Sequence, residues 1–178
     1  MGIGVKALAL PILAAVLAAS SVPATAQTPE LFAGFVMSRV CLPYASRAKT
    51  FENAVRAARD MEFRRPVGSA PLDDWASEVE LVSKDGRWRL RLQEGTEAEG
   101  DVEYYSVTCG VSSTQASTRE LGDVARLLLR NNPLWSQRDE TPWRWDRRTR
   151  QPTETAIRLD VTEARGQRPV LAARGSYY

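Results

Sequence analysis

Aromatic and basic side chains alternate in a stretch near the C-terminal end of the chain. Residues 134–150 hold three tryptophans and five arginines. A tryptophan ring offers a flat stacking surface and a guanidinium group a planar cation, a pairing suited to sugars, anionic glycans or nucleic acid. An edge strand with buried tryptophans and solvated arginines has the same pattern, and this is the commoner case. The candidate binding surface consists of Trp135, Trp143, Arg144, Trp145, Arg147 and Arg148.

The chain contains no histidine, which removes Ser-His and Cys-His dyads, most zinc sites and the usual acid–base residue near neutral pH. It also lacks a glycine-rich phosphate loop and a G-x-S-x-G motif. What remains is glycosidase-like chemistry, in which two acids flank the bond to be broken. The candidate acids are Asp73, Asp74, Asp139 and Glu140. Acid pairs in loops are usually solvated, so we assign no catalytic residue and predict that the protein is not an enzyme.

An acidic segment carries oxygen ligands that calcium accepts, namely Glu94, Glu97, Glu99 and Asp101. Calcium loops favour several short Asp or Asn side chains in a definite order, whereas this segment is mostly glutamate. We therefore expect a solvated hairpin loop here, and we predict neither a metal site nor a cofactor.

The N-terminus has the three parts of a secretory signal peptide: Lys6, an apolar run over 7–19, and a small-x-small triplet ending at Ala26. The run is shorter than the roughly 20 residues that span a bilayer, and Pro11 interrupts it. We therefore predict a leader over 1–26, cleavage near Ala26, and no integral membrane segment in the mature chain. The mature protein would be periplasmic or secreted.

The only two cysteines, Cys41 and Cys109, indicate a disulfide, because thiols oxidise outside the cytoplasm and only one pairing is possible. Their wide spacing lacks the C-x-x-C arrangement of redox-active pairs. The net charge of +2 gives no general attraction to nucleic acid, and we predict no specific nucleic-acid partner.

Two helices are predicted in the N-terminal part of the mature chain. Apolar residues recur at helical spacing from Leu31 to Val40, and Pro43 is expected to stop this first helix just past Cys41. Thr50 is placed to cap a second helix, whose apolar face runs from Phe51 to Met61.

The segment 77–93 predicts a β-hairpin around the turn Asp85-Gly86. That turn pairs Leu81 with Leu90 on one face, and Glu80 with Arg91 on the other. A third strand follows over 102–109, with Cys109 on its inner face. Ser117 and Glu120 form a capping-box signature for a further helix. Strands around Trp143, over 155–161 and at 169–173 complete the pattern.

The order ααβββαββ(β) predicts a single disulfide-linked α+β domain over 27–178, with helices packed on a five- to six-stranded antiparallel sheet. The function best supported by the sequence is non-catalytic binding of an unknown protein or envelope component. Two alternatives stay open: a carboxylate-dependent hydrolase of envelope polysaccharide, and an inhibitor or immunity-type protein whose acidic segment plugs an enzyme.

Overall fold

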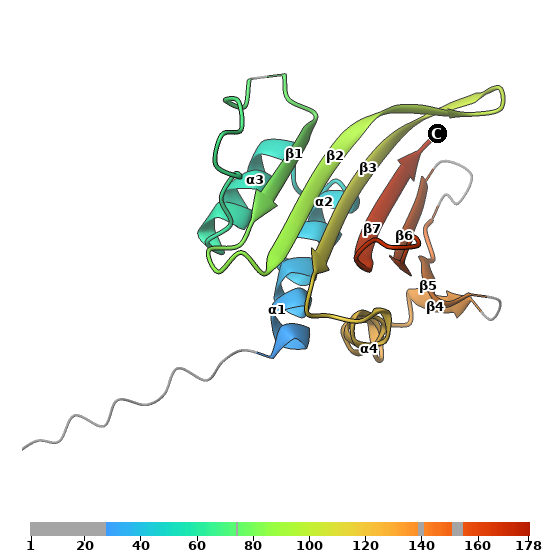
Figure 1. Ribbon diagram of the computed structural model, residues 1–178. Coiled ribbons are helices and arrows are strands. Elements are labelled where there is room, and N and C mark those ends of the chain that lie inside the picture. Colours follow the sequence, from blue (N-terminus) through green and yellow to red (C-terminus); the bar gives the residue numbers. More distant parts are fainter. Residues whose placement is uncertain (1–27, 74, 139–140, 151–154) are drawn as a thin grey trace, which may run out of the picture.

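The computed structural model describes residues 28–73, 75–138, 141–150 and 155–178, so the predicted leader lies outside the described residues. These described residues form one seven-stranded antiparallel sheet in the order β1-β2-β3-β7-β6-β5-β4, with the helices packed on one face (Figure 1). The α+β class is confirmed. Within the described ranges, no helix combines the length and the apolar character needed to cross a bilayer.

The first helix runs continuously through α1 (Pro29–Val36), the π-type segment η1 (Met37–Cys41) and α2 (Leu42–Ala45). The prediction that Pro43 ends this helix is wrong, because α2 continues to Ala45. A proline crowds the preceding turn and lacks a backbone donor. The wider π-type turns directly before Pro43 give its ring room. The helix ends at Ala45, and Arg47, two residues further on, has a φ of 56° in the left-handed region.

The buried face of the first helix differs in part from the predicted one. Val36 and Val40 reach the core as predicted, and so do Met37, Cys41 and Tyr44, all at most 1% exposed. Leu31 and Phe35, which the apolar spacing had placed on the inner stripe, are 52% and 47% exposed. The helix is therefore rotated relative to the prediction, and part of its apolar stripe faces outward.

The other two helices have the capping residues predicted for them. In front of α3 (Phe51–Asp60), the Thr50 hydroxyl accepts a hydrogen bond from the Asn53 backbone N–H at 3.3 Å. In front of α4 (Thr118–Leu129), Ser117 and Glu120 form the reciprocal capping box. Each cap satisfies donors that the first turn of a helix leaves without a partner.

The first hairpin has the predicted register. Strands β1 (Glu78–Val82) and β2 (Trp88–Glu99) pair Leu81 with Leu90 and Glu80 with Arg91. Strand β3 (Val102–Ser113) continues antiparallel to β2 over its full length. The segment 94–101 was expected as a loop, but residues 94–99 instead form the end of β2 and pair with β3.

The C-terminal half adds β4 (Trp135–Arg138), β5 (Thr141–Arg147), β6 (Thr155–Thr162) and β7 (Val170–Tyr177). The predicted count of five to six strands is too low, because the short edge strand β4 was not recognised. Strand β7 pairs with both β6 and β3, so it closes the sheet at its centre.

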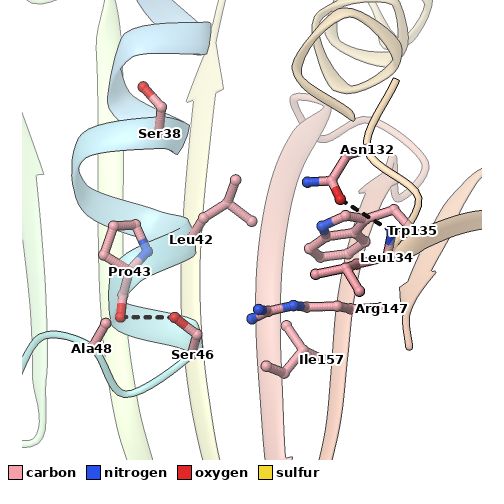
Figure 2. A pocket seen from close by; sticks show the side chains of 10 residues that line it. All are labelled: Ser38, Leu42, Pro43, Ser46, Ala48, Asn132, Leu134, Trp135, Arg147 and Ile157. Carbon is pink, nitrogen blue, oxygen red and sulfur yellow. Dashed lines mark hydrogen bonds between the residues drawn. The ribbon is translucent and has the colours of Figure 1, made fainter. Parts of the chain in front are cut away.

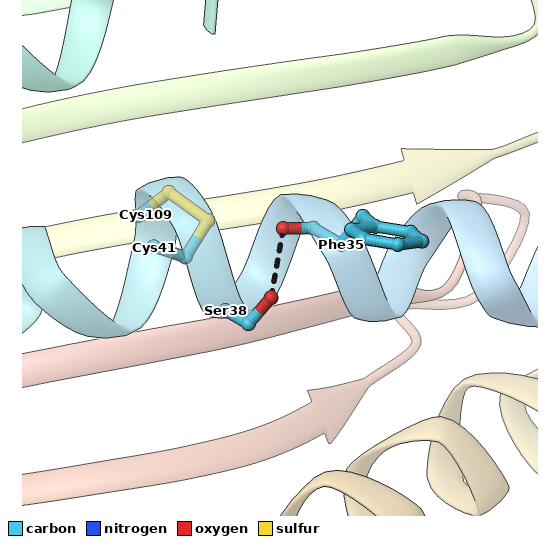
Figure 3. Close-up of a disulfide and its surroundings, with 4 residues drawn as sticks. All are labelled: Phe35, Ser38, Cys41 and Cys109. Carbon is cyan, nitrogen blue, oxygen red and sulfur yellow. Dashed lines mark hydrogen bonds between the residues drawn. A yellow bond between two sulfur atoms is a disulfide. The ribbon is translucent and has the colours of Figure 1, made fainter. Parts of the chain in front are cut away.

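The disulfide Cys41–Cys109 joins the first helix to strand β3 (Figure 3). Both cysteines are fully buried, and no free cysteine accompanies them in the described part of the chain. The predicted pairing is confirmed. The bond fixes the helix across the middle of the sheet, which sets the walls of the site described next.

Candidate functional site

The aromatic–basic stretch forms the hairpin of β4 and β5 at one edge of the sheet. Its register pairs Trp135 with Arg147 and Gln137 with Trp145. Cross-strand partners share a face, and neighbours along a strand alternate between faces. Trp135, Trp145 and Arg147 therefore lie on the helix-covered face, and Arg144 lies on the opposite one. The predicted binding surface is divided between the two faces of the sheet.

Two of its tryptophans contribute to packing. Trp145 is 4% exposed and belongs to the core. Trp143 is half-buried, and a Cβ atom added at Gly122 of α4 would overlap its ring. The guanidinium of Arg126 lies 5.5 Å from the centre of the Trp143 ring. The Trp143 ring thus packs β5 against α4.

The remaining arginines of the predicted surface have different surroundings. On the helix-free face, Arg144 Nε donates to Asp146 Oδ1 at 3.1 Å. Arg148 is exposed just past the end of β5, and its backbone N–H donates to the Leu134 carbonyl at 2.6 Å. Only Trp135 and Arg147 come together at a hollow of the surface.

That hollow, here called the helix–sheet groove, lies between the first helix and strands β4–β6 and has a volume of about 290 Å³. Its ten lining residues are Ser38, Leu42, Pro43, Ser46, Ala48, Asn132, Leu134, Trp135, Arg147 and Ile157. Figure 2 shows the Arg147 side chain extending from the sheet toward the helix, with the ring of Trp135 and the side chain of Leu134 beside it.

The groove presents hydrogen-bond donors and a positive charge. Arg147 has no carboxylate within ion-pair distance among the residues that the structure describes. The Asn132 amide oxygen accepts from the Leu134 backbone N–H at 3.1 Å, which leaves the amide NH₂ group as a donor. The Ser38 and Ser46 hydroxyls donate to the carbonyls of their own helix.

This combination suits a particular kind of ligand group. Leu42, Leu134 and Ile157 supply apolar walls, and Trp135 supplies a ring plane. A guanidinium and an amide NH₂ favour an anionic acceptor. A mostly apolar hollow with a few polar groups is the usual form of a small-ligand site. The groove therefore fits an apolar group that ends in a carboxylate or another anion.

A second polar cluster fastens the end of the first helix to the sheet. The guanidinium of Arg47 lies 5.3 Å from the centre of the Tyr105 ring and 5.1 Å from that of Tyr177. The Tyr177 hydroxyl donates to the Ala45 carbonyl at 2.6 Å. Burial raises the pKa of Tyr177, although the charges of Arg47 and Arg147 act in the other direction. We assign this cluster a structural role.

The acidic candidates of the sequence do not gather at one place. Asp74, Asp139 and Glu140 lie outside the described residues. The carboxylate of Asp73 accepts a hydrogen bond from the Trp75 backbone N–H at 3.0 Å. Among the calcium candidates, Glu94 accepts from the Tyr44 hydroxyl at 2.8 Å and Glu97 from that of Tyr104 at 3.1 Å. In the described ranges, no cluster of three acidic or sulfur side chains is arranged to hold a metal ion.

Sequence reasoning missed the half of the groove that the first helix supplies. Ser38, Leu42 and Ser46 lie on the outward part of this helix, and only the fold brings them opposite Arg147. It also missed Trp75, which is 92% exposed. Trp75 lies in the connection before β1. Other residues of this connection help to enclose a cavity of about 450 Å³ against α3.

Comparison with known proteins finds no family model, no curated protein and no solved structure that matches this chain. The functional argument therefore depends on the residues of the chain itself.

Proposed function

We propose that this chain is a non-catalytic exported protein that binds a partner protein or envelope component through the helix–sheet groove. One observation carries the proposal: the fold brings Trp135 and Arg147 together at a hollow where the arginine has no acidic partner in the described part of the chain. A half-buried guanidinium gains most from an anion that a ligand supplies.

The proposal names the part of the partner that enters. A volume of about 290 Å³ accommodates a side chain or a short acyl or aromatic group, not a polymer. The anionic end would meet Arg147 and Asn132, and the apolar body would lie against Trp135 and Leu42. Export supports a partner in the envelope, where a leader over 1–26 would deliver the protein.

Site-specific photocrosslinking tests this proposal. A photoreactive residue at Leu134, on the exposed rim of the groove, is expected to form an adduct with an envelope component. Arg147→Ala and Trp135→Ala are expected to reduce the yield of adduct at least roughly tenfold, as for loss of one charge-assisted contact. Arg148→Ala is the matched control, because it removes a neighbouring exposed arginine outside the groove. Equal yields from Arg147→Ala and Arg148→Ala would exclude the groove.

A specific observation also favours the inhibitor or immunity-type function. The β2–β3 ladder continues past the residues that pair with β1 and β7, so 97–104 forms a two-stranded arm (Figure 1). This arm has four acidic residues and no lysine or arginine. An acidic arm is a suitable plug for a basic active site.

The arm is tested separately from the groove. If it plugs a basic enzyme, Glu97→Gln with Glu99→Gln is expected to weaken a complex with a basic cell-wall lysozyme and to flatten its salt dependence. Arg147→Ala is expected to leave that complex unchanged. Unchanged affinity in the double variant would remove this alternative.

A further inference from the structure

Four arginines gather on the face of the sheet that the helices leave uncovered. Arg138, Arg144, Arg158 and Arg174 come from the adjacent strands β4, β5, β6 and β7. Alternation places the last three on this face, because Trp145, Leu159 and Ala173 point into the core on β5, β6 and β7. The hydrogen bond from Arg138 to Asp146 brings Arg138 to the same face. Two acids, Asp146 and Asp160, share the face with them.

The two acids are already engaged by three of the arginines. Asp160 accepts from Arg174 Nε at 3.2 Å. Asp146 accepts from Arg144 Nε at 3.1 Å and also from Arg138. Although partial burial disfavours its charged form, these two hydrogen bonds hold the pKa of Asp146 below its usual range. Neither carboxylate is paired with Arg158.

Arg158 forms no ion pair within the described ranges, although it lies at a central position among the strands that carry the two acids. The register places it directly opposite Arg174 on β7 and Asp146 on β5. Its Nε is buried and has no hydrogen-bond partner, and it makes no ion pair within the described ranges. A buried donor without a partner is unfavourable, and so are like charges directly across two strands. Both features are relieved by an anion.

We propose that Arg158 and Arg174 bind a phosphate or sulfate group on the helix-free face of the sheet. Directly opposed residues of neighbouring antiparallel strands lie about 5 Å apart, so one tetrahedral oxyanion reaches both guanidinium groups. Each guanidinium presents a planar fork that matches two oxygens of such a group. The hydroxyl of Thr108, opposite Arg174 on β3, lies on the same face. This site is independent of the helix–sheet groove.

The direct test monitors the Nε–H group of Arg158, the buried donor that has no hydrogen-bond partner. In the ¹⁵N-labelled protein, the Nε–Hε signal of Arg158 is expected to shift saturably when inorganic phosphate replaces chloride at constant ionic strength. Arg158→Gln is expected to weaken phosphate binding at least about tenfold, as for the loss of one charge-assisted pair. Arg158→Lys keeps the charge but loses the fork, and its affinity is expected to lie between those two.

Arg91→Gln is the matched control. It removes an arginine from the same face, but one that is already paired with Glu78 at 2.6 Å, so phosphate affinity is expected to be unchanged. Tighter binding of glucose 1-phosphate than of inorganic phosphate would indicate a group carried on a saccharide, and equal binding the free ion. An unmoved Arg158 signal, or equal phosphate affinity in Arg158→Gln and the unchanged protein, would overturn the proposal.

Discussion

At the scale of single residues, the arginines of this chain differ in whether they form an ion pair with an acidic side chain. Arg89 and Arg91 pair with Glu80 and Glu78, and exposed pairs of this kind contribute little to stability. Arg147 and Arg158 have no such partner in the part of the chain that the structure describes. These two arginines are therefore the ones most available to bind an anion that a ligand supplies.

Asp146 makes this face of the sheet sensitive to acid. Its folded-state pKa lies below the usual value of 3.8, so its contribution to stability is complete above that value and is lost as the pH falls through the folded-state pKa. We expect Asp146→Asn to lower the free energy of unfolding by about 1 kcal/mol at pH 7. Its deficit is expected to be smaller at pH 3 than at pH 7, because the contribution of Asp146 declines as the pH falls below 3.8. Denaturant unfolding at both pH values measures this, and a deficit of the same size at both would contradict it.

Trp143 provides a residue-level test of packing against binding. Because its ring packs on Gly122 and Arg126, Trp143→Ala is expected to lower the free energy of unfolding by about 2 kcal/mol, less than a fully buried tryptophan would. The matched control is Trp75→Ala, which removes a ring that is 92% exposed and is expected to change stability by less than about 0.5 kcal/mol. Equal midpoints of unfolding for the two variants would mean that Trp143 does not belong to the core.

At the scale of elements, the end of the first helix lies directly against strand β7. A Cβ atom added at Gly175 would overlap the Ala45 carbonyl and contact the Tyr177 ring. The same carbonyl accepts the hydrogen bond from Tyr177. Glycine at this position is therefore what lets the helix backbone approach the sheet closely.

Gly175→Ala is accordingly expected to lower the free energy of unfolding by about 2 kcal/mol, because overpacking a well-packed contact costs roughly 1–3 kcal/mol. Gly95→Ala is the control: Gly95 also lies in a strand, but an added Cβ there meets nothing within 4 Å. Thermal unfolding of both variants gives the comparison. A stability loss as large for Gly95→Ala would mean that strand propensity, not the contact with Ala45, is being measured.

Helices and strands were predicted correctly where the signal lies in a few neighbouring residues. The Asp85-Gly86 turn predicted the register of β1 and β2, and Ser117 with Glu120 predicted the start of α4. The errors arose where the sequence pattern carries no recognisable signal. The extension of the helix through Pro43 depends on the π-type segment before it, and β4 is a strand only because β5 pairs with it.

The candidate site could be predicted only in part, for the same reason. Trp135 and Arg147 carried a visible signal in the sequence, and they do line the groove. The opposite wall comes from a helix about 100 positions earlier, and its residues are unremarkable serines and leucines. Arg158 had no signal at all, because its lack of a partner appears only when four strands lie side by side.

At the scale of the whole molecule, the sheet consists of two meanders that meet at its centre. Strands β1 to β3 follow the first helix and α3, and strands β4 to β7 follow α4. The last strand of each meander, β3 and β7, pair antiparallel. The disulfide connects the first helix to β3, so it links the helices to the sheet near the place where the two meanders pair.

The covalent link leads to a prediction for the intact protein. The unreduced mature chain is expected to begin near Gln27 and to be lighter by the mass of two hydrogen atoms than its dithiol form, measured by mass spectrometry. Opening a loop of 68 residues is expected to lower the free energy of unfolding by about 4 kcal/mol. Reduction without a change in stability would contradict the second part, and an uncleaved leader would contradict the first.

A chain exported with its N-terminal end first would bring Cys41 out of the cytoplasm well ahead of Cys109, which follows 68 positions later. All of α4 and the second meander emerge after that. The thiols can therefore join when only half of the sheet exists, and β7 then adds to a β3 that is already fastened to the helix. The order of emergence favours an early covalent template on which the C-terminal strands assemble last.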